Sequence, residues 1–105
     1  MNDPRLLRLH ATDNVLTVIR TLEAGDMIDI EGASVRVSTQ LRIGHKVAAR
    51  AIDAGEKILK YGAPIGSATC DIAIGEHVHT HNLGSDYLHT FLREDQARYF
   101  AQPQR

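Results

Sequence analysis

The sequence predicts a small, mainly β domain that ends in one C-terminal helix, and three observations support this. Short apolar runs alternate with glycines along most of the chain, as in domains built from short strands and tight turns. One turn pattern recurs among those runs, and only the last segment carries apolar residues at helical spacing. The length of 105 residues fits one folding domain, and a hydrophobic share of 43% is typical of a globular protein.

Short apolar runs predict the strands, and the first of them is rich in β-branched side chains. The second and third runs flank Gly32 and form a predicted hairpin, in whose turn glycine takes a positive φ. Alanines in the fourth run also allow a helix, but its short length and glycine-bounded ends favour a strand. The predicted strands are residues 14–19, 27–30, 34–38, 46–52, 57–61 and 77–81.

A seven-residue pattern occurs at residues 22–28, 52–58 and 72–78. Each copy has an apolar residue, a glycine three positions later, an acidic residue, and an apolar residue that starts a strand. This pattern is typical of a tight turn in which glycine adopts φ > 0. Because the copies are unequally spaced, they do not predict a solenoid.

The C-terminal segment has helical spacing instead. Ser85 is a candidate N-cap and Asp86 is favourable in the first turn. We therefore expect an amphipathic helix over residues 86–100, which divides the chain into a β domain at residues 1–84 and a helix and tail at residues 85–105. The apolar stripe of this helix consists of Leu88, Phe91, Leu92 and Tyr99.

Composition excludes several classes of protein. Twelve Lys and Arg against 13 Asp and Glu give a net charge of -1, which lacks the basic excess of a nucleic-acid-binding protein. A single cysteine, Cys70, excludes an intrachain disulfide and fits a reducing compartment; we expect it to be a small buried residue. No signal peptide and no membrane-length apolar run are present. The expectation is a cytoplasmic protein with no nucleic-acid and no membrane partner.

Three of the six histidines, His77, His79 and His81, alternate along one predicted strand and would share one face. Neighbouring same-face Cα atoms lie about 6.6 Å apart on a strand, so two imidazoles can reach one divalent ion. The outer two histidines would be roughly 13 Å apart, too far for all three to share one ion. We expect two metal ligands, His79 and His81, and one free histidine for acid–base chemistry. The alternative is a polar surface strand.

Two further segments carry candidate binding residues. His45 and Lys46 follow a glycine at the start of a strand, where they could bind a carboxylate; the alternative is an exposed turn. Lys60 and Tyr61 begin a segment that Pro64 makes rigid, so we expect a loop. Lys60 could neutralise a carboxylate or enolate, and Tyr61 could donate a proton or pack at the edge of the core. A fourth segment, His10 with Asp13 and Asn14, is consistent with an Asx turn.

These segments also carry a resemblance to a known family. Residues 10–15, 44–46, 58–66 and 75–82 occur in this order and resemble the N-terminal SAF-type domain of altronate and galactarate dehydratases. They equally resemble the separate small subunit of sulfolactate sulfo-lyase and related sugar-acid dehydratases. The resemblance implies a β-clip fold, a long bent hairpin folded on itself. It also implies a lyase that removes water or sulfite from a hydroxylated carboxylate, assisted by a divalent metal such as iron or manganese.

In the fused enzymes of that family, a much larger catalytic domain follows the histidine segment, whereas here only the predicted short helix follows it. The resemblance therefore implies a small subunit of a hydro-lyase that needs a large catalytic subunit for activity on a small hydroxy acid. The alternatives are a sulfo-lyase small subunit, a module that binds a sugar acid or metal without turnover, and a purely structural domain. For an enzyme subunit, the expected catalytic residues are His77, His79 and His81, and the expected substrate-binding residues are His45, Lys46, Lys60 and Tyr61.

Overall fold

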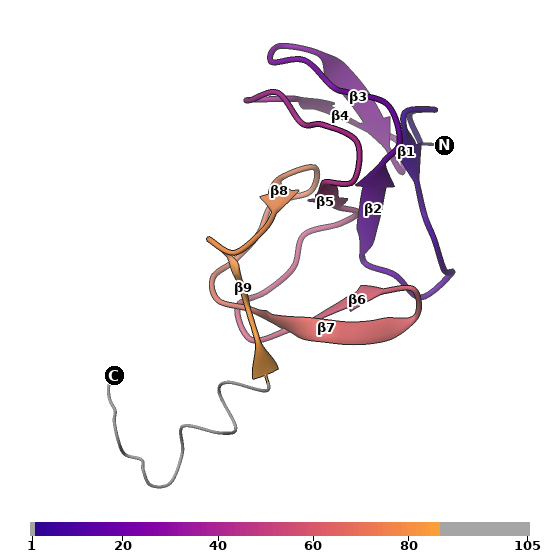
Figure 1. Ribbon diagram of the computed structural model, residues 1–105. Coiled ribbons are helices and arrows are strands. Elements are labelled where there is room, and N and C mark those ends of the chain that lie inside the picture. The colour runs from indigo at the N-terminus through magenta and orange to yellow at the C-terminus, as the bar shows by residue number, and fades with distance from the viewer. Residues whose placement is uncertain (1, 87–105) are drawn as a thin grey trace, which may run out of the picture.

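A computed structural model describes residues 2–86 of the chain, and all of its secondary structure elements are short strands (Figure 1). The mainly β prediction is confirmed. The strands are β1 (Leu6–Leu7), β2 (Val15–Val18), β3 (Met27–Ile30), β4 (Ala33–Arg36), β5 (Lys46–Ala48), β6 (Lys57–Lys60), β7 (Ala63–Ala68), β8 (His77–Val78) and β9 (Leu83–Gly84).

The strands form a central sheet with one hairpin on each side (Figure 1). The central sheet has the order β1-β2-β5-β8, and each neighbouring pair is antiparallel. Hairpin β3–β4 lies above it in the view of Figure 1, and β6 and β7 lie below it, with β9 paired to β7. This arrangement is consistent with the expected β-clip fold.

Residues along β2 point alternately to opposite sides of the central sheet, and each side packs against an apolar cluster. Leu16 and Val18 pack into one apolar cluster together with Ile28 and Ile30 of the β3–β4 hairpin. Val15 packs into a second cluster with Ile58 of β6 and with Val78 and Ala48. The two hairpins are thus fixed to the sheet by separate cores, each side chain of which contributes on the order of 1.5–3 kcal/mol when fully buried.

The turn prediction is confirmed at each copy of the repeated pattern. Gly25, Gly55 and Gly75 have φ values of 92°, 87° and 80°. The first hairpin turn also has the expected geometry, since Glu31 and Gly32 both have positive φ, at 51° and 89°. Two consecutive residues at φ > 0 are characteristic of the type I′ turn that joins twisted antiparallel strands.

Several predicted boundaries were wrong. The strand expected at residues 46–52 ends at Ala48, and the strand expected at residues 77–81 ends at Val78. The segment expected to be a loop after Tyr61 is instead strand β7, which contains Pro64. The β6–β7 register shifts between Ile58 and Leu59, and such an irregularity accommodates a proline inside a strand pair. Strands β1 and β9 were also missed.

Two other expectations concern the end of the chain and the cysteine. The helix predicted over residues 86–100 lies almost wholly outside the described residues. Cys70 is exposed, so the prediction that it is buried was wrong; it lies in a bend after β7 and not in a core strand. Within residues 2–86, the structure contains no helix with the length and apolar character needed to cross a bilayer.

Candidate functional site

The site is built on a tight turn that follows β8. The side chain of Asn82 is fully buried; its Oδ1 accepts a hydrogen bond from the His79 N–H at 2.9 Å, and its Nδ2 donates to the His77 carbonyl at 2.9 Å. The Asn82 N–H in turn donates to the His79 carbonyl at 3.0 Å. These three hydrogen bonds fold the chain back on itself just after Val78.

The turn gathers three imidazoles and places them beside a fourth from the start of β5. His45 Nδ1 and His77 Nε2 are 3.0 Å apart, so the two rings share a hydrogen bond. The ring centre of His77 lies 4.9 Å from that of His45, 5.5 Å from that of His79 and 5.7 Å from that of His81. We call these four side chains the histidine cluster, with His77 at its centre.

The predicted grouping of the histidines was right, but its geometric reason was wrong. An extended strand would separate His77 and His81 widely, whereas the turn brings their ring centres to 5.7 Å. The ring planes of His77 and His79 are 7° from parallel, so their in-plane lone pairs do not converge on one point. Within the described residues, no three His, Cys, Asp or Glu side chains are arranged to hold one metal ion.

The donor chemistry of the cluster nevertheless fits a partial metal site. Imidazole nitrogen is a good ligand for iron, whereas manganese favours oxygen ligands. A metal ligand must be a neutral imidazole. Burial lowers the pKa of His77 to about 4, and the neighbouring His45 adds to this shift. His77 is therefore neutral at pH 7.

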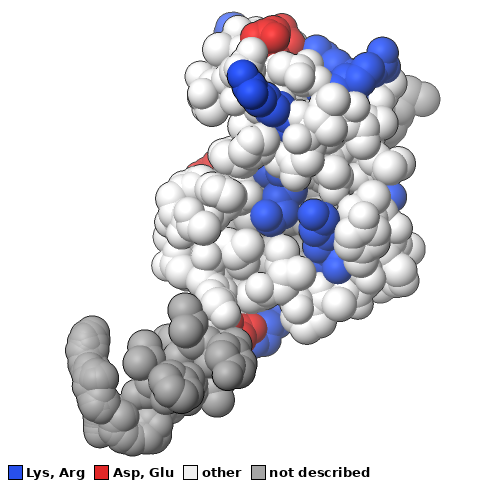
Figure 2. All heavy atoms as spheres, viewed as in Figure 1, with Lys and Arg blue, Asp and Glu red and all other residues white. Residues whose placement is uncertain are grey.

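Lys46 lies next to the cluster, and Lys60 lies near Lys46. Lys46 comes from β5 and is half-buried; burial lowers its pKa, and the charge of Lys60 at the end of β6 lowers it further. Neither lysine forms an ion pair with any residue from 2 to 86. Figure 2 shows Lys and Arg side chains gathered at the centre of one face, with Asp and Glu only toward its margins. An anion is the ligand that such a face attracts.

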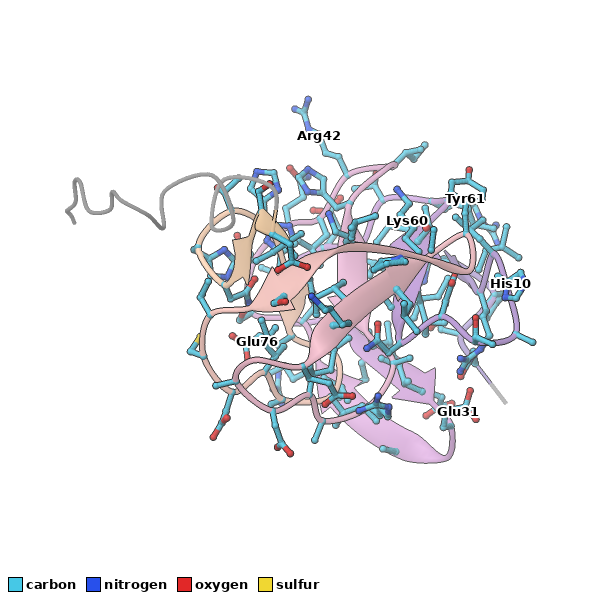
Figure 3. All side chains as sticks on the ribbon, turned by 90° about the horizontal axis from the view of Figure 1, so that it is seen from below. His10, Glu31, Arg42, Lys60, Tyr61 and Glu76 are labelled. Carbon is cyan, nitrogen blue, oxygen red and sulfur yellow. The ribbon has the colours of Figure 1, made fainter. Side chains whose placement is uncertain are left out.

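Tyr61 lies at the exposed tip of the β6–β7 hairpin. Its side chain is 69% exposed, with Lys60 Nζ 5.8 Å from the ring centre, so it does not pack at the edge of the core. Figure 3 shows Tyr61 and Lys60 on the same side of the domain as Arg42, with Glu31 on the opposite side. The structure thus brings His45, Lys46 and Lys60 toward one region and leaves Tyr61 at its exposed rim.

One set of positioning residues was missed from the sequence. Asp13 is buried, and its carboxylate accepts hydrogen bonds from the backbone N–H groups of Tyr61 at 3.0 Å and Gly62 at 2.8 Å. Asn14 accepts from the Leu59 N–H and donates to the carbonyl of Lys57, both at 2.8 Å. The segment read as a local Asx turn therefore fastens the distant hairpin that carries Lys60. The only signal in the sequence for this role was the position of two adjacent polar residues directly before an apolar run.

A hollow of about 320 Å³ opens beside the cluster, a volume at the lower end of small-molecule sites. It lies where β5 begins and β8 ends. Two histidines of the cluster and the exposed Ile43 contribute to its wall. Its lining consists of Ile43, Gly44, His45, Lys46, Val78 and His79.

Comparison with known proteins connects these residues with a family. A family model described as the altronate/galactarate dehydratase SAF domain matches residues 4–86. Altronate dehydratase from Bacillus subtilis (strain 168) is 42% identical over 76 residues, and that from Escherichia coli (strain K12) is 40% identical over 76 residues. Each match covers 72% of this chain but 15% of the relative. The chain thus spans a small part of the length of these relatives.

A second kind of relative is short. The alpha subunit of (2R)-sulfolactate sulfo-lyase from Chromohalobacter salexigens is 32% identical over 83 residues, which cover 71% of this chain and 88% of that subunit. The same subunit from Paracoccus pantotrophus is 52% identical over 40 residues, or 38% of this chain and 60% of that subunit. The matched residues of the family model include the whole histidine cluster, both lysines and the central sheet. The chain therefore belongs to the altronate/galactarate dehydratase SAF domain family.

Proposed function

We propose that this domain is the small subunit of a hydro-lyase that removes water from a hydroxylated sugar acid, and that it works with a larger catalytic subunit. The observation that carries the proposal is the histidine cluster beside two lysines that have no ion pair within residues 2–86. Membership of the family supports the lyase class. The larger size of the altronate dehydratases supports the need for a catalytic unit beyond this domain.

In this proposal the substrate carboxylate binds to the ammonium groups of Lys46 and Lys60, which supply charge-assisted hydrogen bonds. Tyr61, at the exposed rim, contacts the ligand once the catalytic subunit covers this face. The lowered pKa of Lys46 fits a cation held ready for an anion, because an incoming carboxylate would relieve its unfavourable burial.

The proposed reaction is a β-elimination. A base removes the proton α to the carboxylate, the C–O bond at the β carbon breaks, and the hydroxyl leaves as water after gaining a proton. The resulting enol becomes a 2-oxo acid. His77 is the proposed proton-transfer group, and His79 and His81 are the catalytic residues that would hold a divalent ion. The 3.0 Å contact between His77 and His45 offers a path by which a proton can pass between the two rings.

We further propose that His79 and His81 contribute two ligands to a divalent ion, with the remaining ligands supplied by the catalytic subunit. Iron fits these imidazole donors better than manganese does. When bound, such an ion would supply electrostatic stabilisation of the negative charge that develops on the substrate. His77, held neutral by its surroundings, would contact the substrate from the centre of the cluster.

A second candidate function is the small subunit of a sulfolactate sulfo-lyase. One observation favours it: the chain covers 88% of the Chromohalobacter alpha subunit, so the two are of similar extent. In that case the leaving group is sulfite and the same cation-rich face binds the sulfolactate anion.

Copurification tests the proposal. The full chain carrying an affinity tag is used to capture partners from the lysate of its source organism, with the tag alone as a control. We expect a partner several times larger than this chain, and a complex that forms a 2-oxo acid from altronate or galactarate. Release of sulfite from sulfolactate would select the second candidate. A complex with the large partner that turns over none of these acids would contradict both.

A further inference from the structure

Within the described residues, four turns share one geometry. Each has a glycine at positive φ, followed by a residue whose N–H binds the carbonyl three positions earlier. The glycines Gly25, Gly44, Gly55 and Gly75 have φ values of 92°, 97°, 87° and 80°. The N–H groups are those of Asp26, His45, Glu56 and Glu76, and their hydrogen bonds measure 3.0, 3.1, 3.0 and 3.0 Å.

In three of these turns the residue after glycine is acidic and closes the turn with its side chain. The carboxylate of Asp26 accepts a hydrogen bond from the Glu23 N–H at 2.9 Å. The Glu56 carboxylate accepts from the Asp53 N–H at 3.0 Å, and that of Glu76 from an N–H at 2.9 Å. A carboxylate at this position therefore stabilises the repeated turn, because it accepts a hydrogen bond from a backbone N–H of the turn.

The fourth turn has no such carboxylate. His45 stands where the other turns have the acid, and no side chain within residues 2–86 accepts the Arg42 N–H that a carboxylate would bind. Its imidazole points away from the turn, with Nδ1 at 3.0 Å from His77 Nε2. This turn has the same backbone hydrogen bond and the same glycine as the other three, but it lacks the side-chain hydrogen bond.

The two hairpins also differ at equivalent positions, at the last residue before each turn. Ile30, the last residue of β3, is fully buried before the first type I′ turn. The corresponding last residue of β6 is Lys60, only half-buried and followed by Tyr61 and Gly62, both at positive φ. A core residue in one hairpin is thus a cation in the other, close enough to Lys46 to lower the pKa of that lysine.

We infer that His45 is a ligand-contacting residue, held at a turn position where the fold itself would favour a carboxylate. Its imidazole contacts an oxygen of a bound hydroxy acid whose carboxylate lies on Lys46 and Lys60. This inference rests on the proposed function for the class of ligand. It separates His45 from the capping residues Asp26, Glu56 and Glu76, which belong to the fold.

The test measures stability and binding together in the full chain. The deciding variant is His45→Gln, because glutamine can reach the Arg42 N–H as glutamate would, and it adds no charge to repel an anion. The matched control is Glu56→His, the reverse exchange in a turn outside the cluster. Binding of meso-tartrate, a small dihydroxy dicarboxylate, is followed by NMR of the histidine rings, and Tm by calorimetry.

We expect His45→Gln to keep or raise Tm and to weaken tartrate binding at least about tenfold, the effect of one lost hydrogen bond to a charged group. Glu56→His should lower Tm by about 4–8 °C and bind tartrate as the wild type does. Unchanged binding by His45→Gln, or a fall in Tm equal to that of the control, would overturn the inference. So would a wild-type chain that does not respond to tartrate. If His45→Gln loses tartrate binding and the assembled wild-type complex shows no turnover, the result would support the inference and contradict the proposed lyase function.

Discussion

At the scale of single residues, His79 is the best position at which to separate chemistry from folding. Its side chain is exposed, and its backbone N–H, which an alanine variant keeps, makes the hydrogen bond to Asn82. We expect His79→Ala to change Tm little and to lower turnover of the assembled complex by about a hundredfold or more, the scale of a lost catalytic group. Cys70→Ala, at another exposed position, is the control. Normal turnover by a fully assembled His79→Ala complex would exclude a catalytic role for this side chain.

Asn82 has the opposite role, because it contributes structure and no chemistry. Removing its buried side chain leaves the His79 N–H and the His77 carbonyl without their partner. We expect Asn82→Ala to lower the free energy of unfolding by about 2–3 kcal/mol, measured by urea denaturation. Thr80→Ala, in the same turn but exposed, should change it by less than about 0.5 kcal/mol. Equal stabilities of the two variants would show that the turn does not depend on the amide.

These two residues also show what a sequence can reveal about a site. Three closely spaced histidines are visible in the sequence and indicate a functional site. Their actual contacts depend on the buried amide of Asn82, which turns the chain where alternation predicted a straight strand. The pairing of His45 with His77 depends on the neighbouring positions of β5 and β8 in the sheet, and no local pattern encodes that neighbourhood.

At the scale of secondary structure elements, turns were predicted more reliably than strand ends. Glycine followed by an acid has a local physical cause in the positive φ of one residue. Strand ends have no such cause: Ala49 continues an apolar run but lies beyond the end of β5. Strand β7 was missed because Pro64 and Gly66 disfavour strands locally, whereas pairing with both β6 and β9 stabilises it.

The pairing of β7 with β9 can be tested at Gly66. A Cβ at this position would lie 2.3 Å from the carbonyl oxygen of Gly84 and 2.8 Å from Leu83 Cδ1, so alanine would force the two strands apart. We expect Gly66→Ala to lower the free energy of unfolding by about 2–3 kcal/mol, as overpacking does. The control is Gly25→Ala, where no atom lies within 4 Å of an added Cβ and only the positive φ opposes alanine, at about 1–2 kcal/mol. The measurement is urea denaturation, and a smaller loss of unfolding free energy for Gly66→Ala than for Gly25→Ala would contradict the observed close approach of the strands.

At the scale of the whole molecule, charge is distributed unevenly although the net charge is only -1. Arg5, Arg8 and Arg50 are paired with carboxylates. Lys46 and Lys60 are not paired within the described residues, and they lie on the face that carries the histidine cluster. The near-neutral total therefore conceals a local positive potential, which composition alone could not reveal.

This distribution predicts how anion binding depends on salt. Two cations on one face attract an anion by an interaction that salt screens, with a Debye length of about 30 Å at 0.01 M and about 8 Å at 0.15 M ionic strength. We expect the affinity of the full chain for meso-tartrate to fall several-fold between these two ionic strengths. The double variant Lys46→Gln with Lys60→Gln should bind about tenfold or more weakly at low salt and lose most of the salt dependence.

In the assembled complex the same variant should raise KM more than it lowers kcat, because the lysines bind the carboxylate in the ground state and the transition state alike. The control is Lys57→Gln, which removes a lysine paired with Asp86 outside the histidine cluster and should leave the salt dependence intact. Equal salt dependence in the double variant and the wild type would show that the anion binds to another part of the surface.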